Sequence, residues 1–317
     1  MKRFVVTGAG GSIGSQLCAR IVKANAERLV LVSLTEGGLY DVERKLRAIK
    51  SDTEIVGMLG SVRDLGMMHD ACNGADVVIH AAAHKHVPIC ESNPIAAIEN
   101  NVHGTIIASR AAEKESVKQF LFVSSDKAVH PASIMGATKR VAEMVIADRA
   151  ARSKHTIFST VRFGNVLDSA GSVLPLWREQ LETGNPITLT DKRCERYFMS
   201  IPEACELIFG VLEMKKPGTF VFDMGEPRKM IDIAEELIAD FRGPHNPNIE
   251  ITGLRPGEKL TEELHHGGDL ESTSHEKIFE IKGKDKSVKM VRLDDLLCAA
   301  TCRKGKIAVA LLRKMAA

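Results

Sequence analysis

The residues with the clearest chemistry are Ser125, Asp126 and Lys127, which place a hydroxyl, a carboxylate and an amine next to one another. An acid beside a base can take a proton from carbon while a departing hydroxyl is protonated, which is what the elimination of water requires. Asp126 and Lys127 could equally form a plain ion pair on the surface. Lys139 follows Met135 by one helical turn, and a thioether cannot take up a proton. The acid and the base are therefore expected at Asp126 and Lys127 rather than at Met135.

A strand must hold these groups in place. Within the predicted strand 119–123, residues 120–123 form a continuous apolar run just before them, which is typical of a strand buried on both faces of a parallel sheet. Similar runs alternate with helical spacing at 15–26 and 39–49, and this alternation predicts a doubly wound α/β sheet of the Rossmann type. Ligands of such a sheet bind at the carboxyl ends of its strands, where 125–127 lie. The other predicted strands are Phe4–Thr7, Leu29–Val32, Val77–His80, Phe158–Val161 and Phe220–Phe222.

The chain is predicted to divide near residue 164. Strands and helices alternate in 1–164, whereas longer loops rich in glycine, proline and asparagine follow in 165–317. We expect 1–164 to form a dinucleotide-binding Rossmann domain and 165–317 to form mainly a smaller, interleaved lobe for the substrate. The strand predicted within 219–224 is expected to return to the Rossmann sheet.

Three glycines spaced three residues apart, Gly8, Gly11 and Gly14, follow the first predicted strand within Thr7-Gly8-Ala9-Gly10-Gly11-Ser12-Ile13-Gly14. A dinucleotide site needs a tight turn, a backbone free of Cβ atoms beside the pyrophosphate, and a small residue where helix meets strand. The first turn of the following helix offers its N–H groups to the phosphates. The strand before the loop and the helix after it favour this interpretation over a purely structural turn. The cofactor residues predicted from the loop are Gly8, Gly11, Ser12, Ile13 and Gly14.

Four further residues extend the predicted cofactor site. Ala81 and Ala82 follow a predicted strand, and their small side chains let the chain pass close to a flat ligand. Ser33 stands where an acid would bind the ribose 2′-hydroxyl of NAD. Because serine does not repel a 2′-phosphate, NAD and NADP both stay open, with a slight preference for NADP. The GxxGxxG spacing resembles that of the extended short-chain dehydrogenase/reductases, and this resemblance implies that Asp64 contacts the adenine.

A more specific resemblance comes from the segment around Met135 and Lys139, which stands where this superfamily has Tyr-x-x-x-Lys. Together with Ser125–Val129, Pro131 and Ile134–Arg140, it closely resembles the polysaccharide-biosynthesis UDP-N-acetylglucosamine 4,6-dehydratases, in some of which methionine replaces the tyrosine. The resemblance covers the chain from about residue 3 to about residue 265. Other matching stretches are Leu39–Tyr40, Lys85–Pro88, Asn93–Pro94, Asn100–Val102, Val161–Leu167, Gly171–Val173, Arg196–Met199, Asp223–Pro227 and Gly253–Lys259.

The resemblance implies a reaction and a role for single residues. NAD(P)+ takes a hydride from C4 of the sugar, the ketone acidifies the C5 proton, and the hydride returns to C6 once water has left. Lys127 is then the base at C5, Asp126 the acid for the C6 hydroxyl, and Ser125 a partner of the 4-hydroxyl. Lys139 binds the nicotinamide ribose beside Met135. The residues implied for the UDP-sugar site are Lys85, Asn165, Gly171, Ser172, Val173, Arg196, Arg255 and Glu258.

Departures from the family pattern occur at Ser33, Asp168, Ala170 and Thr261. They leave the cofactor, the sugar and the product open. A UDP-sugar C4-epimerase on the same scaffold is one alternative, although that reaction normally uses the missing tyrosine. A non-catalytic sensor of NAD(P) or nucleotide sugars is the other. The loss of the tyrosine favours a sensor, whereas the retained acid, base and lysine oppose it.

The composition limits the partners. Lys and Arg number 43 against 41 Asp and Glu, a net charge of +2 that lacks the basic excess of a nucleic-acid binder. Seven scattered cysteines without a Cys-x-x-Cys pair predict reduced thiols in a cytoplasmic protein and no metal site. No apolar run suggests a signal peptide or a transmembrane segment. We expect a homo-oligomer. The tail 302–317 is predicted to be a docking helix or a frayed terminus, with a helix on a membrane surface as the alternative.

Overall fold

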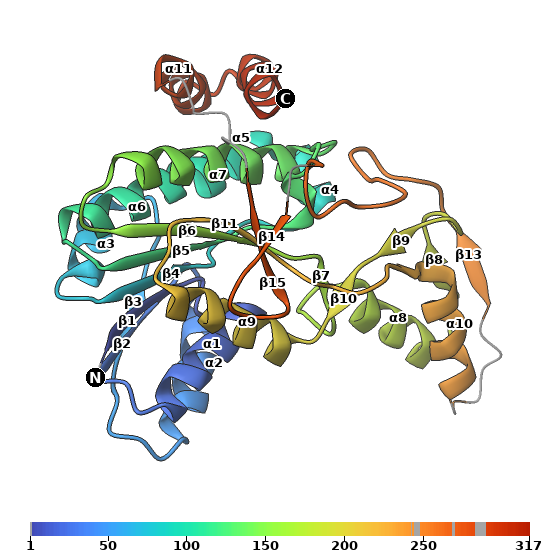
Figure 1. Cartoon of the computed structure of the whole chain (residues 1–317). Coiled ribbons are helices and arrows are strands. Elements are labelled where there is room, and N and C mark those ends of the chain that lie inside the picture. Colours follow the sequence, from blue (N-terminus) through green and yellow to red (C-terminus); the bar gives the residue numbers. More distant parts are fainter. Residues whose placement is uncertain (1, 242, 244–247, 268–269, 283–289) are drawn as a thin grey trace.

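One sheet lies at the centre of the computed structural model, which describes residues 2–241, 243, 248–267, 270–282 and 290–317. Its strands are β1 (Arg3–Thr7), β2 (Arg28–Ser33), β3 (Glu54–Leu59), β4 (Val77–His80), β5 (Gln119–Val123), β6 (Ile157–Arg162), β11 (Gly218–Phe222), β14 (Leu270–Ser272) and β15 (Ile278–Ile281). The strand order is β14-β15-β11-β6-β5-β4-β1-β2-β3 (Figure 1). Pairing is parallel from β3 through to β11, and antiparallel where β15 and β14 follow. The predicted Rossmann-type α/β sheet is confirmed.

Helices cover both faces of the sheet (Figure 1). One face carries α1 (Ser12–Lys23), α2 (Glu36–Arg47) and α9 (Ile201–Met214), which share a core with the strands. The other carries α3 (Leu65–Cys72), α6 (Gly104–Lys114) and α7 (Ile134–Arg152), with a second core. Since successive strand residues point to opposite faces, a strand covered on both sides must be apolar throughout. This is why β4 and β5 are buried along their whole length.

Helix α7 is enclosed on two sides. All its residues from Ile134 to Ile146 are buried, because the sheet lies beneath it and two C-terminal helices, α11 (Met290–Thr301) and α12 (Gly305–Ala316), lie above it (Figure 1). Ala308 and Leu312 of α12 are buried in the core between these helices. The tail therefore docks on the protein, which is one of its predicted arrangements. Within the described ranges, no helix has the length and apolar character that a membrane span needs.

A smaller lobe extends beyond the carboxyl ends of the central strands (Figure 1). Its core surrounds the fully buried Trp177. Its elements are β7 (Asn165–Val166), α8 (Val173–Glu182), β8 (Ile187–Leu189), β9 (Glu195–Arg196), β10 (Phe198–Met199), β12 (Arg228–Lys229), α10 (Met230–Asp240) and β13 (Ile249–Ile251). Other elements from residues 165–317, namely α9, β11, β14 and β15, belong to the large sheet or pack on it instead.

Some predicted boundaries are wrong. Helix α1 spans Ser12–Lys23 rather than 15–26, because Gly11 is extended as its N-cap and Asn25 turns left-handed at φ 56°. Helix α2 starts earlier than predicted, since Glu36-Gly37-Gly38 in its first turn offers no apolar residue to the periodicity. The apolar pattern does not predict β3, an edge strand in which exposed and half-buried residues alternate.

Candidate active site

A cleft of about 800 Å³ joins the glycine loop to the residues after β5 and to the smaller lobe. Ser33, Asp64, Ala82 and Asp126 are not among the described residues that line it. The predicted site residues that do line it are Gly8, Gly11, Ser12, Ile13, Gly14, Ala81, Lys85, Ser125, Lys127, Met135, Lys139, Asn165, Gly171, Ser172, Val173, Arg196, Arg255 and Glu258.

The glycine loop is packed so closely that it leaves no room for side chains. Gly8 has φ +70°, and a Cβ atom there would lie 2.8 Å from the backbone nitrogen of Ala82. A Cβ atom on Gly14 would collide with the carbonyl oxygen of Gly8. Because α1 begins at Ser12, the N–H groups of its first turn lie at the end of the cleft. A bare backbone at a helix N-terminus fits the pyrophosphate of a dinucleotide.

The other predicted cofactor residues, Ser33, Asp64 and Ala82, form hydrogen bonds within the protein. Ser33 is buried at the end of β2, and its hydroxyl donates to the carbonyl oxygen of Thr35 at 3.2 Å. Asp64 caps α3, since its carboxylate accepts the backbone N–H of Met67 at 3.0 Å. The contact between Asp64 and the adenine, which the resemblance implies, stays a prediction. The backbone N–H of Ala82 donates to the Thr7 hydroxyl at 3.3 Å, which draws this segment against the glycine loop.

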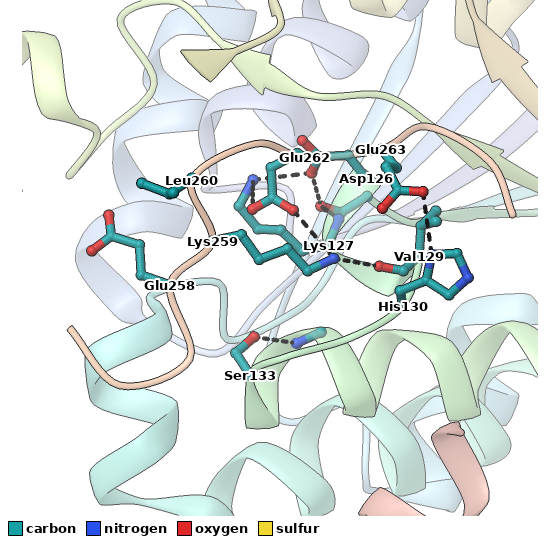
Figure 2. A network of polar contacts seen from close by, with 12 residues as sticks. Asp126, Lys127, Val129, His130, Ser133, Glu258, Lys259, Leu260, Glu262 and Glu263 are labelled. Atoms are coloured by element: carbon teal, nitrogen blue, oxygen red, sulfur yellow. Dashed lines mark hydrogen bonds and ion pairs between the residues drawn. The ribbon is translucent and has the colours of Figure 1, made fainter. Parts of the chain in front are cut away.

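Ser125, Asp126 and Lys127 form one hydrogen-bonded group where β5 passes into the short 3-10 helix η2 (Asp126–Ala128). Figure 2 shows Asp126 and Lys127 of this group. The Ser125 hydroxyl donates to Asp126 Oδ1 at 2.7 Å, and Lys127 Nζ donates to the same oxygen at 3.0 Å. Lys127 Nζ also donates to Asn165 Oδ1 at 2.9 Å. The Asp126 side chain is 0% exposed, so the surface ion-pair interpretation is wrong. Its other oxygen, Oδ2, lacks a hydrogen-bond partner among the described residues.

Met135 and Lys139 lie one turn apart on α7 and line the same wall of the cleft. Lys139 Nζ donates to the carbonyl oxygen of Val123 at 2.6 Å and lies 4.4 Å from the ring centre of Phe122. Burial lowers the pKa of Lys139 to about 8, although the nearby Glu143 opposes the shift. A buried amine at this place has donors to spare for a ribose hydroxyl.

The loop at 168–172 crosses between the two parts of the chain. The backbone N–H of Ala170 donates to the Ser12 hydroxyl at 2.8 Å, and Lys85 Nζ donates to the Ser169 hydroxyl at 3.5 Å. Gly171 has φ +67°, and a Cβ atom there would lie 2.5 Å from the ring of His86. Ser172 is the N-cap residue of α8, so the predicted UDP-binding loop ends at a helix N-terminus.

The guanidinium groups of the two predicted substrate arginines differ in their exposure and in the hydrogen bonds that they already make. Arg196 is buried, and its guanidinium donates to the carbonyl oxygens of Glu195, Leu260 and Lys259 at 2.7, 2.8 and 2.8 Å. It thereby holds the 255–262 segment in place. Arg255 is 58% exposed and only loosely tied, with Nε 3.4 Å from Glu258 Oε2. A diphosphate in the cleft would therefore meet Arg255 more readily than Arg196.

Glu262 lies beside the acid-base group, although no motif in the sequence points to it. Its side chain is 6% exposed, and its Oε1 lies 3.9 Å from Lys127 Nζ. It lines a side chamber of about 410 Å³ that shares Lys127 with the main cleft. Burial raises the pKa of Glu262, and the Lys127 ammonium opposes that shift. The run of charges at 258–263 within an irregular segment is the signal that could have drawn attention to it.

A larger cavity, of about 1440 Å³, lies elsewhere in the molecule. It is bordered by α7, β11, β15 and the end of α12, and none of the predicted site residues lines it. The cleft along the strand ends is therefore the better candidate, because that is where the chemistry-bearing residues meet.

Both the sequence and the fold are similar to those of known proteins. The sequence model of a family described as "Polysaccharide biosynthesis protein" matches residues 4–283. The capsular polysaccharide biosynthesis protein CapD of Staphylococcus aureus is 41% identical over 287 residues, which make up 89% of this chain and 48% of CapD. The chain spans about half the length of CapD and of a second curated relative, the probable polysaccharide biosynthesis protein EpsC of Bacillus subtilis.

Two further matches bear on the fold and on the reaction. A UDP-glucose 4-epimerase of Rickettsia prowazekii is 32% identical over 275 residues, covering 85% of this chain and 79% of the epimerase. The X-ray structure of Pen from Bacillus thuringiensis matches with a TM-score of 0.83 and 29% identity, over 94% of this chain and 97% of that chain. The similarity to solved structures thus extends over nearly the whole chain.

Proposed function

This chain belongs to the polysaccharide biosynthesis protein family, and on that premise we propose that it is an NAD(P)-dependent UDP-N-acetylglucosamine 4,6-dehydratase. The product would be a UDP-4-keto-6-deoxy sugar for surface glycans or glycoproteins. One observation carries the proposal: a buried Asp126 and a cleft-lining Lys127 share hydrogen bonds at the end of β5, across from the glycine loop. Elimination of water needs such an acid and base together.

Each group of residues on the cleft wall has its own role in the proposed reaction. Gly8, Gly11 and Gly14 would hold the pyrophosphate of a bound NAD(P)+, which would supply the acceptor for the C4 hydride and the hydride for C6. Lys127 takes the C5 proton once C4 is a ketone. Lys139 holds the nicotinamide ribose. The end of the 168–172 loop, the start of α8, Lys85 and Arg255 hold the UDP part, because backbone N–H groups and exposed cations suit a diphosphate.

The C4 hydroxyl proton needs a route that does not involve a phenol. Neither Tyr40 nor Tyr197, the two tyrosines of the chain, belongs to the described lining of the cleft. Ser125 does line it, and its hydroxyl already donates to Asp126 Oδ1 at 2.7 Å. A proton can pass from the C4 hydroxyl to Ser125 and from Ser125 to Asp126. Asp126, once protonated, becomes the acid for the departing C6 hydroxyl, and its proton reaches that hydroxyl through Ser125, because Asp126 is not among the described residues that line the cleft.

A C4-epimerase is the second candidate, and the similarity to a UDP-glucose 4-epimerase favours it. Its reaction also starts with hydride removal at C4. It then needs a group that exchanges the 4-hydroxyl proton and has no use for a base at C5. The hydrogen-bonded Lys127 favours the dehydratase, since an amine placed beside a carboxylate serves elimination.

Incubating the protein with UDP-GlcNAc and either NAD or NADP, followed by mass spectrometry, tests the proposal. A product lighter than the substrate by one water supports dehydration. An isomer of unchanged mass would instead support epimerisation, and unchanged UDP-GlcNAc with both cofactors would support a binding protein without activity. The comparison of the two cofactors also decides whether Ser33 admits the 2′-phosphate.

Met135→Tyr, which restores the superfamily residue, should lower turnover rather than raise it. Met135 is 3% exposed and packs in the core beneath α11 and α12. The ring of tyrosine is bulkier, and its hydroxyl needs a partner in a packed site, at a cost of about 1–3 kcal/mol. Met135→Leu is the matched control, because leucine is similar in volume and also lacks a titratable proton. Turnover of UDP-GlcNAc should stay near that of the wild type with leucine. A large gain with tyrosine would contradict the route through Ser125.

A further inference from the structure

Glu262 is the carboxyl group that shares Lys127 with Asp126 (Figure 2). Its Oε1 lies 3.9 Å from Lys127 Nζ, a gap that a small side-chain rotation or one bridging water closes. Its Oε2 has no hydrogen-bond partner among the described residues and lies 3.9 Å from Lys259 Nζ. Lys259 is held elsewhere, since its Nζ donates to the carbonyl oxygen of Val129 at 2.8 Å.

The proposed reaction has two protons to place on this side of the cleft. Asp126 receives the first, from the C4 hydroxyl through Ser125. The second is the extra proton of the Lys127 ammonium, which must leave before the amine can act as a base at C5. Asp126 cannot hold both, because a carboxylate takes up one proton. A second acceptor within reach of Lys127 is therefore needed, and Asn165, the other partner of Nζ, offers only an amide oxygen.

We propose that Glu262 is a positioning residue that takes the proton of the Lys127 ammonium and so makes the lysine a base. In this step an N–H bond at Nζ breaks and an O–H bond at Oε1 forms, which leaves the electron pair of Nζ free for the C5 hydrogen. When the hydride is delivered to C6, the lysine returns its proton to C5, and Glu262 then returns its own proton to Nζ. The proposal rests on the proposed dehydration and adds to it the group that activates the base.

The surroundings of Glu262 suit a carboxyl that gains and loses a proton. Burial raises its pKa and the nearby Asp126 adds to this, whereas Lys127, Arg196 and Lys259 oppose it. The group is therefore easier to protonate than a glutamate in water, yet cations face it from both η2 and β9. The other charged or titratable residues that line the side chamber are Lys85, His86, Arg255 and Glu258.

The test compares the full-length wild type with Glu262→Gln, using UDP-GlcNAc and cofactor over about pH 6 to about pH 10. Without the internal acceptor, the lysine proton must leave to solvent. Turnover of the variant should fall by about 10²-fold near neutral pH and recover toward wild type as pH rises, with KM little changed. In acid-quenched samples the C4 ketone that still carries its C6 hydroxyl should accumulate, because hydride removal precedes the slowed step.

Glu263→Gln is the matched control, since Glu263 is the adjacent glutamate, is 57% exposed and pairs with His130. It should behave as the wild type. Equal turnover of Glu262→Gln and wild type would overturn the proposal. So would a deficit that is the same at every pH, which indicates a structural role, or a gain at acidic pH, which indicates that Glu262 only stabilises the ammonium. If the wild type itself releases no water, the proposed function fails first, and the proposal falls with it.

Discussion

Lys127→Ala should abolish nearly all loss of water from UDP-GlcNAc, lowering turnover by about 10²-fold or more, as the removal of a general base typically does. Lys127 Nζ lines the cleft and is held between Asp126 Oδ1 and Asn165 Oδ1 at 3.0 and 2.9 Å. Removal of the amine leaves the C5 proton without an acceptor. The measurement is turnover by mass spectrometry, together with the affinity for UDP.

The binding of UDP should barely change, because the nucleotide is held by other residues. Asp126→Asn should lower turnover to a similar extent, since an amide can neither take the C4 proton nor pass it on. Lys306→Ala removes an exposed lysine on α12, away from the cleft, and should leave both turnover and affinity unchanged. Near-normal turnover in both Lys127→Ala and Asp126→Asn would remove this pair from the mechanism.

Glu143→Leu should destabilise the folded protein by about 3–5 kcal/mol, because it leaves a buried cation without its carboxylate. Glu143 is 1% exposed and lies on α7, one helical turn after Lys139. Its two oxygens accept from Arg162 Nε and an Arg162 terminal nitrogen at 2.7 and 2.6 Å, and from the Ser124 hydroxyl at 2.6 Å. The measurement is the free energy of unfolding from denaturant titration at constant pH.

Glu113→Gln offers a matched control at a similar pair nearer the surface. Glu113 accepts from Arg149 at 2.7 Å, but its side chain is 38% exposed, so its loss should cost below about 1 kcal/mol. Adding Arg162→Met to Glu143→Leu should recover a large part of the stability, because an apolar pair can replace a buried ion pair. A loss of stability no greater than that of Glu113→Gln would show that the Glu143 network contributes little.

The sequence predicts well whatever depends on local pattern. The parallel strands, the glycine loop and the group at 125–127 all follow from short runs whose physics is contained in neighbouring residues. The edge strand β3 is missed because one side of it faces water. Glu262 is missed because its meaning comes from Lys127, a residue far away in the sequence that only the folding of the 255–262 segment brings within 3.9 Å.

Arg196 has a structural role that its sequence motif does not reveal. Arginine in a predicted substrate motif suggests a phosphate ligand, and the residue does line the cleft. Three of its hydrogen bonds, however, go to main-chain carbonyl oxygens of Glu195, Lys259 and Leu260. Which acceptors surround a guanidinium depends on tertiary structure, so the type and motif of the residue could not reveal this second role.

The double enclosure of α7 has a consequence for how a catalytic cycle can move. The helix cannot shift without disturbing the sheet on one side and the C-terminal pair of helices on the other. We therefore expect Met135 and Lys139 to keep their distance from the turn after β5 when a ligand binds. Adjustment to ligands is expected instead in the smaller lobe around α8. One wall of the cleft is thus fixed by α7 and the sheet, and the other belongs to the smaller lobe. A ligand of a different shape could therefore be accommodated by sequence changes in the smaller lobe alone.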